Sequence, residues 1–378
     1  MNIIRLSRSI VGQQEADAVS RLIVEDGYLG MGKEVELFER DIANYLSVDP
    51  ADVTCVNSGT AALHLAIQAI AQPGNDILVP SLTFLASYQA ISAVGATPIS
   101  CEVRRDTFTI DLQDAERRLT ENTVAIFPVH YASNPAGLEK TYAFAQKHRL
   151  RVVEDAAHAF GCTYQDKLIG SFGDIVCFSF DGIKNITSGE GGAIVTKDKA
   201  IQSLVKDARL LGVEKDTEKR YSGQRSWDFD VKAQGFRYHM SNIFAAIGRT
   251  QLARFDNEFA PVRRAYFEQY QKQLKDVPGL GFQKVDLSER FVPHIFPIRV
   301  LNGQRDALKV YLEKQGIQTG IHYKPNHLLT FYGGGKVSLP FTEQLYDELM
   351  TLPLHPGLRS QDINFICQQI RQAFLVEV

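Results

Sequence analysis

Residues 53–101 read VTCVNSGTAALHLAIQAIAQPGNDILVPSLTFLASYQAISAVGATPISC, and their pattern is the clearest guide to the fold. Short β-rich runs alternate here with helical stretches. The predicted strands and helices are 53–56, 60–71, 76–79, 84–94 and 98–101. Continuous apolar strands separated by helices predict a mostly parallel sheet covered on both faces. Ligands bind such a sheet at the carboxyl ends of its strands.

Two amphipathic helices are predicted before this stretch, at 11–25 and 33–47. After it, the alternation of strands and helices continues to about residue 250. Further predicted elements are strands at 125–128, 151–154, 175–180 and 192–196 and a helix at 138–148. Beyond residue 256 the pattern predicts helices at 258–275, 304–316, 341–350 and 360–373 and a strand at 292–300. We therefore expect a large α/β domain with an N-terminal arm at 1–255 and a smaller α+β domain at 256–378.

Composition excludes several classes of protein. The net charge of the 378 residues is −3 and the basic residues are dispersed, which argues against nucleic acid as a main partner. Neither a signal peptide nor a run of about 18 apolar residues is found, so we expect no membrane span. The cysteines form no CxxC pair or metal pattern, which favours reduced core residues of a cytosolic protein. They are Cys55, Cys101, Cys162, Cys177 and Cys367.

Residues 57–62, NSGTAA, follow a predicted strand and open a helix. The backbone N–H groups and the dipole of a helix N-terminus bind phosphate, and Ser58 and Thr60 add hydroxyls. The alternative is an ordinary serine or threonine helix cap.

Asp155 ends the predicted strand RVVED, and His158 follows it closely. A carboxylate at this end of a strand faces the ligand crevice and would hold a pyridine nitrogen in its protonated form. Alternatively, Asp155 caps the next turn and His158 is a structural histidine.

Lys184 lies on a polar loop after another strand, five residues beyond Ser179. A Schiff-base lysine needs partial desolvation or nearby cations, whereas a generic loop lysine is solvated. Phe84 follows the strand at 76–79 and would either stack on a ligand ring or belong to the core. Because these features all lie at strand ends of one sheet, together they fit pyridoxal 5'-phosphate (PLP).

The chain resembles the DegT/DnrJ/StrS family of nucleotide-sugar aminotransferases over nearly its whole length. The resemblance is carried by VNSGTAALHLAI, VPSLTFLASYQAI, VEDAAHAFG, FSFDGIKNITSGEGGAIV and IHYKPNH, of which the lysine segment with its GEGG is the most specific. It implies the fold type I, aspartate aminotransferase-like architecture, with a seven-stranded, mostly parallel sheet.

The resemblance also implies roles for individual residues. Lys184 would be the Schiff-base lysine and proton carrier, Asp155 the partner of the pyridine nitrogen and Phe84 the stacking aromatic. His158 would lie beside the phenolic oxygen, and relatives with histidine there often aminate C4 of the sugar. The remaining cofactor contacts would be Ser58, Gly59, Thr60, Ala61, Ser179 and Asn185.

One segment departs from the family, which commonly has asparagine at the place of Arg237 and arginine at the place of His239. In the family the asparagine reaches the cofactor phosphate of a neighbouring subunit, so a homodimer with shared sites is implied, and Arg237 would take over this contact. Substrate contacts are expected from Tyr28, Met31, His322, Tyr323 and Lys324. A long insertion at 213–234, with Arg225 and Trp227, would contact the nucleotide or be plain surface.

The implied reaction moves an amino group, through pyridoxamine phosphate, from an amino acid to a nucleotide-linked keto sugar. L-Glutamate is the expected donor and C4 of a 4-keto-6-deoxy hexose the expected acceptor, in amino-sugar biosynthesis of the O-antigen type. Alternatives are a C3 aminotransferase, another reaction of the same fold, and a PLP-binding sensor or non-catalytic homologue.

Overall fold

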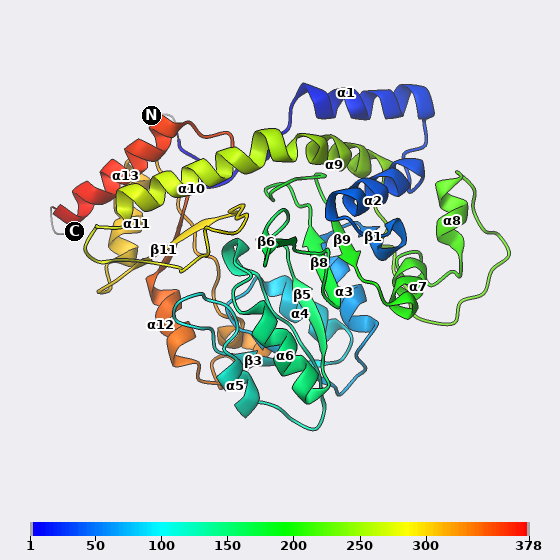
Figure 1. The fold of residues 1–378 in the computed structure, drawn as a ribbon, viewed down its shortest axis with the longest axis horizontal. Helices are drawn as coiled ribbons and strands as arrows, with labels where there is room; N and C mark the ends of the chain where they lie inside the picture. The colour runs from blue at the N-terminus through cyan, green and yellow to red at the C-terminus, as the bar shows by residue number, and fades with distance from the viewer. Residues whose placement is uncertain (1–2, 376–378) are drawn as a thin grey trace.

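A seven-stranded sheet forms the centre of the protein in the computed structural model, which describes residues 3–375 (Figure 1). Its strands, in order across the sheet, are β1 (Val53–Val56), β9 (Gly192–Val195), β8 (Ile175–Ser179), β5 (Arg151–Asp155), β4 (Thr123–Ile126), β2 (Asp76–Pro80) and β3 (Thr97–Cys101). All neighbours pair in parallel except β9, which runs antiparallel to both β1 and β8. The predicted fold class is therefore confirmed.

Helices cover both faces of this sheet because its strands are apolar on both sides. In β2, Ile77 and Val79 pack into one core cluster and Leu78 into another on the opposite face. One face carries α3 (Gly59–Gln68), α4 (Leu85–Ala93) and α7 (Lys199–Ala208). The other carries α2 (Lys33–Leu46), α5 (Leu112–Arg117), α6 (Leu138–His148) and α9 (Asn242–Arg254).

The chain after α9 builds a second, three-stranded antiparallel sheet. A π-helical turn at Phe255–Phe259 leads into α10 (Ala260–Leu274), which runs across the upper left of Figure 1, beside α13. The sheet contains β10 (Leu280–Phe282), β11 (Phe296–Val300) and β12 (Leu349–Leu352), and it shares a core cluster with α10, α11 (Arg305–Lys314) and α13 (Ser360–Leu375). The division into domains 1–255 and 256–378 stays a prediction.

Two predicted elements in this part are corrected. The helix expected at 341–350 ends earlier, as α12 (Pro340–Glu348), because the chain becomes extended at Leu349 and pairs with β11. The strand expected at 292–300 begins only at Phe296. Residues 292–294 instead use backbone groups to contact the segments around Asn185 and Arg263, so they do not pair as strand.

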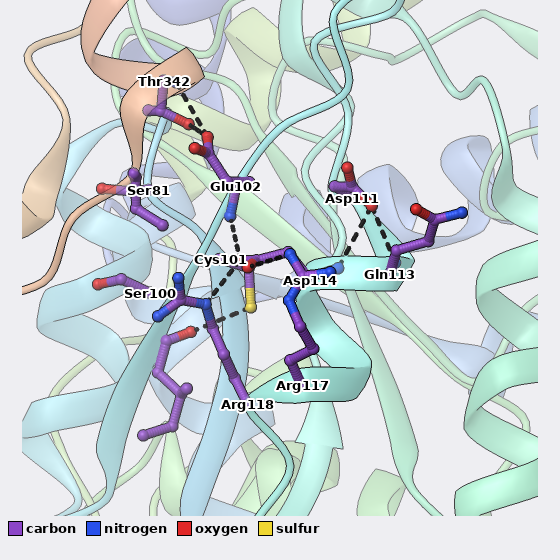
Figure 2. Close-up of polar contacts among 12 residues, drawn as sticks. Ser81, Ser100, Cys101, Glu102, Asp111, Gln113, Asp114, Arg117, Arg118 and Thr342 are labelled. Carbon is purple, nitrogen blue, oxygen red and sulfur yellow. Dashed lines mark hydrogen bonds and ion pairs between the residues drawn. The ribbon is translucent and has the colours of Figure 1, made fainter.

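Glu102, directly after β3 (Thr97–Cys101), connects α12 to the large sheet (Figure 2). Its carboxylate accepts hydrogen bonds from the N–H groups of Phe341 and Thr342, at 3.0 and 2.9 Å, and so caps the start of that helix. The N–H of Glu102 in turn donates to Asp114, which also pairs with Arg118. This polar chain joins the edge of the large sheet to the C-terminal segment.

The insertion at 213–234 contains a short helix, α8 (Asp216–Tyr221), which the sequence pattern did not predict. The C-terminal end of α8 is held in place because the hydroxyl of Tyr221 donates a hydrogen bond to Glu39. Glu39 also forms an ion pair with the buried Arg209. Trp227, further along the insertion, is 85% exposed.

All five cysteines are free and buried. Within residues 3–375, no helix combines the length and apolar character needed to cross a bilayer.

Candidate active site

A cavity of about 290 Å³ lies at the carboxyl ends of β1, β2, β4, β5 and β8, where the sheet was expected to bind its ligand. The structure brings many of the predicted site residues together there. They are Ser58, Gly59, Thr60, Phe84, Asp155, His158, Ser179, Lys184, His322 and Tyr323. A larger hollow of about 800 Å³ beside α1 (Gln13–Arg21), α2 and α9 contains none of them.

Asp155 is the last residue of β5 and is buried. Its Oδ2 accepts a hydrogen bond from Ser87 Oγ at 2.8 Å, and its Oδ1 accepts one from the N–H of Ala157 at 3.1 Å. Burial raises the pKa of Asp155, whereas these hydrogen bonds and the nearby Lys184 oppose the rise. The carboxylate is thus held in place and prepared for a cationic partner.

Lys184 lines the same cavity. Burial lowers the pKa of Lys184 to about 8; the carboxylates of Asp155 and Asp181 oppose this shift, and the cation of Arg263 adds to it. No residue among 3–375 forms a hydrogen bond or ion pair with its Nζ. At pH 7 roughly a tenth of the amine is therefore unprotonated and free to react, far more than for an ordinary lysine.

The N-terminus of α3 forms one wall of the cavity. Ser58 caps the helix, with Oγ accepting from the N–H of Ala61 at 3.1 Å, so the cap and the phosphate interpretations of this segment are compatible. Gly59 lies so close to Ser179 that a Cβ on Gly59 would be 2.7 Å from the Cβ of Ser179. Ser58, Gly59, Thr60 and Ser179 all line this part of the cavity, and backbone N–H groups and hydroxyls at a helix N-terminus are suited to binding an anion.

His158 is buried as a neutral imidazole, because burial lowers its pKa well below the usual value. Its Nδ1 accepts a hydrogen bond from the N–H of Ala132 at 3.3 Å, so the proton resides on Nε2. That nitrogen lies 3.2 Å from the hydroxyl of Tyr323. The ring of Phe84, 57% exposed, lies 5.4 Å from that of Tyr323 and leaves an aromatic surface open to the cavity.

A C-terminal segment completes the site by docking on the loop after β2. Asn326 Nδ2 donates to the carbonyl of Thr83 at 2.8 Å, and His327 Nδ1 lies 2.7 Å from Ser81 Oγ. These contacts place His322 and Tyr323, four residues earlier along the same segment, at the cavity. Burial lowers the pKa of His322 to about 4, so this ring is also neutral.

The structure does not bring six predicted site residues to the cavity. Ala61 does not line the cavity, and its N–H donates a hydrogen bond to Ser58 Oγ. The amide of Asn185 donates to the carbonyls of Phe160 and Val292, both at 3.1 Å. Met31 is fully buried in the core, so its side chain does not support the expected substrate contact. The other three lie outside the cavity; they are Tyr28, Arg237 and Lys324.

Several residues at the site were not predicted from the sequence. Ser87 donates a hydrogen bond to Asp155 and lies one helical turn after Phe84. Its polar side chain, on the same helix face as Phe84, could have indicated that it faces the site. His294 packs beside His158 with ring centroids 4.4 Å apart, and it is a polar residue within the apolar run VPHIF. Tyr131, His130 and Glu190 line the cavity without a comparable local pattern.

The residues present fit PLP. An unpartnered amine at Lys184, a buried carboxylate at Asp155, an open aromatic face at Phe84 and a helix N-terminus with hydroxyl groups lie around one cavity. These are the groups needed for a Schiff base, a protonated ring nitrogen, a planar ring and a phosphate.

Comparisons with known proteins give consistent results. The sequence profile of the DegT/DnrJ/EryC1/StrS aminotransferase family matches residues 10–371. The spore coat polysaccharide biosynthesis protein SpsC of Bacillus subtilis is 31% identical over 97% of this chain and 95% of its own. The sugar aminotransferase CalS13 from Micromonospora echinospora has a TM-score of 0.89 at 28% identity, covering 98% of this chain and 100% of its own. Spr1654 from Streptococcus pneumoniae, in its PLP form, has a TM-score of 0.91 at 26% identity over both whole chains, and a PMP form is also known.

Proposed function

This chain belongs to the DegT/DnrJ/EryC1/StrS aminotransferase family, and from that premise we propose that it aminates C4 of a nucleotide-linked 4-keto-6-deoxy hexose with L-glutamate as donor. The observation that carries the transfer is the unpartnered Lys184 amine in a cavity with the buried Asp155 carboxylate. C4 is favoured by His158, which the resemblance associates with that position. Amination at C3 is the second candidate.

PLP is the cofactor, and when bound it supplies an electron-withdrawing ring that stabilises negative charge on the reacting carbon. Ser58, Gly59, Thr60 and Ser179 would hold its phosphate, and Phe84 would fix the plane of its ring. Asp155 would keep the ring nitrogen protonated, because a carboxylate beside that nitrogen favours its charged form.

Proton movement is assigned to Lys184. With a pKa of about 8, its Nζ can release and take up a proton near neutral pH. The neutral His158 offers a proton on Nε2 and so can donate a hydrogen bond to an oxygen in the cavity. Tyr323 lies beside this nitrogen and would hold the imidazole in a fixed orientation.

A sugar acceptor is supported by two relatives, one named as a sugar aminotransferase and the other as a polysaccharide biosynthesis protein. We assign sugar contacts to His322 and Tyr323, which line the cavity. Arg225 and Trp227 of the 213–234 insertion would contact the nucleotide, which needs a cation and an aromatic surface. The product would be an amino sugar for a surface polysaccharide of the O-antigen type.

A homodimer with shared sites is part of the proposal. An apolar groove of about 660 Å³ along α1 includes Val11 and Val24, which are 55% and 79% exposed. Thr187 and Gly189 of the Lys184 loop also line it, so a second copy seated there would touch the active-site loop. Arg237 is exposed and lies outside the cavity of its own chain, which leaves it available to the site of that second copy.

The test is a pair of half-reactions on the purified protein loaded with PLP. L-Glutamate is expected to discharge the yellow absorbance of the bound cofactor and to yield 2-oxoglutarate. The aminated cofactor is then expected to react with a nucleotide 4-keto-6-deoxy hexose, and NMR of the product locates the new amine. An amine at C3, or reaction only with a 3-keto sugar, would favour the second candidate. Lys184→Ala is the inactive control.

A further inference from the structure

Arg263, on α10, is a buried cation without an acidic partner. Arg263 is one of the largest fully buried side chains of the protein, and only 2% of the residue is exposed. The other fully buried arginine, Arg209, pairs with Glu39 at 2.5 Å. Arg263 has no carboxylate within ion-pair distance among residues 3–375, and burial lowers its pKa to about 10. A buried charge without a counter-ion costs free energy, so its presence calls for an explanation.

The guanidinium of Arg263 contacts only backbone carbonyl groups. Its Nη1 donates to the carbonyls of Pro293 and His294 at 3.3 and 3.2 Å, and its Nη2 donates to the carbonyl of Lys184 at 3.2 Å. One side chain thus joins α10, the segment that enters β11 and the loop that carries the reactive lysine. The planar guanidinium can bridge these carbonyls in a way that a single ammonium group cannot.

The charge of Arg263 acts on Lys184 as well. The other groups facing the lysine are the carboxylates of Asp155 and Asp181, which favour its protonated form. The three imidazoles around it, those of His158, His294 and His322, are kept neutral by burial. Arg263 is therefore the cation that works against the two carboxylates, together with burial itself.

We propose that Arg263 is a positioning residue for the amino-transfer site, which fixes the backbone of Lys184 through Nη2 and whose unpaired charge favours the unprotonated form of the lysine amine. This inference rests on the proposed role of Lys184. It extends that role to α10, a helix outside the large sheet, and to a residue that does not line the cavity.

The experiment measures the protonation of Lys184 in the cofactor-free protein. The rate at which an acylating reagent labels the Lys184 peptide is followed by mass spectrometry as the pH is raised. In Arg263→Gln, we expect the apparent pKa of Lys184 to rise by about one unit relative to the wild type. Arg264→Gln is the matched control, because Arg264 is the next residue on the helix and pairs with Glu268 near the surface. Equal profiles in wild type and Arg263→Gln would overturn the inference.

Arg263→Lys separates charge from geometry and also decides the matter if Arg263→Gln does not fold. The lysine retains a positive charge, but its single ammonium group cannot donate hydrogen bonds to all three carbonyls as the guanidinium does. We expect its labelling profile to stay near that of the wild type, while PLP reconstitution slows about tenfold, in line with the rate cost of misplacing a reacting group. A profile shifted as far as that of Arg263→Gln, or an unchanged reconstitution rate, contradicts the inference. Wild-type reaction with glutamate and sugar tests the proposed function separately.

Discussion

Ser87 Oγ lies 2.8 Å from Oδ2 of Asp155 and donates a hydrogen bond to it from the first turn of α4. The same hydroxyl lies 2.8 Å from Thr83 Oγ1, so a short chain of hydroxyls leads from the loop after β2 to the carboxylate. Because Asp155 is buried, this donor helps to retain its negative charge.

Replacing Ser87 by alanine is expected to raise the pKa of Asp155 further and to reduce turnover about tenfold, the effect of losing one hydrogen bond to a charged group. Ser92→Ala, on the same helix but bonded to Tyr88 and Tyr332, is the control. Steady-state kinetics over a range of pH measures the effect. Equal rates in both variants would show that Ser87 does not support Asp155.

Lys184→Met is expected to stabilise the cofactor-free protein. The unfolded chain binds a proton at a pKa of about 10.4 and the folded chain only at about 8, so the wild type loses free energy of unfolding as the pH falls through this window. Below pH 8 the loss is complete, and its removal is worth about 3 kcal/mol. Urea unfolding at neutral and at high pH measures it, with Lys197→Met on the surface as control. A gain that does not shrink at high pH would contradict this cause.

Phe84→Ala is expected to weaken PLP binding about fivefold, because the ring loses its stacking partner, worth about 1 kcal/mol. The folded protein should retain its stability, since Phe84 is 57% exposed. Phe331, 76% exposed and outside the cavity, provides the matched alanine control. Cofactor titration followed by absorbance gives both affinities, and equal affinities would exclude stacking on Phe84.

Val24→Asp is expected to raise the dissociation constant of the proposed dimer at least about tenfold, because it places a charge in the apolar groove along α1. Val310→Asp changes a valine that is 50% exposed on α11 and should leave assembly unchanged. Sedimentation velocity over a range of concentrations measures both. A wild-type protein that stays monomeric, or two variants that assemble alike, would refute the proposed interface.

Local sequence patterns predicted the sheet and the residues at its strand ends, because a strand such as β5 carries its own apolar run and ends at its own candidate site residue, Asp155. Residues that reach the site from distant parts of the sequence leave no such local pattern. The contact of Arg263 with Lys184 spans 79 positions of sequence, and that of Asn326 with Thr83 spans 243. The burial of Met31 was not foreseen for a related reason, since the sequence of a glycine-rich loop does not reveal whether its apolar side chain faces a ligand or the core.

The exposed Trp227 makes the insertion at 213–234 open to direct optical observation. It is the sole tryptophan among the 378 residues and is 85% exposed, so the intrinsic tryptophan emission of the protein comes from this one position in a watery environment. Quenching or a blue shift on addition of a nucleotide or nucleotide sugar would report an event at the insertion itself. A stopped-flow trace of this emission would then time nucleotide capture separately from the colour change at the cofactor.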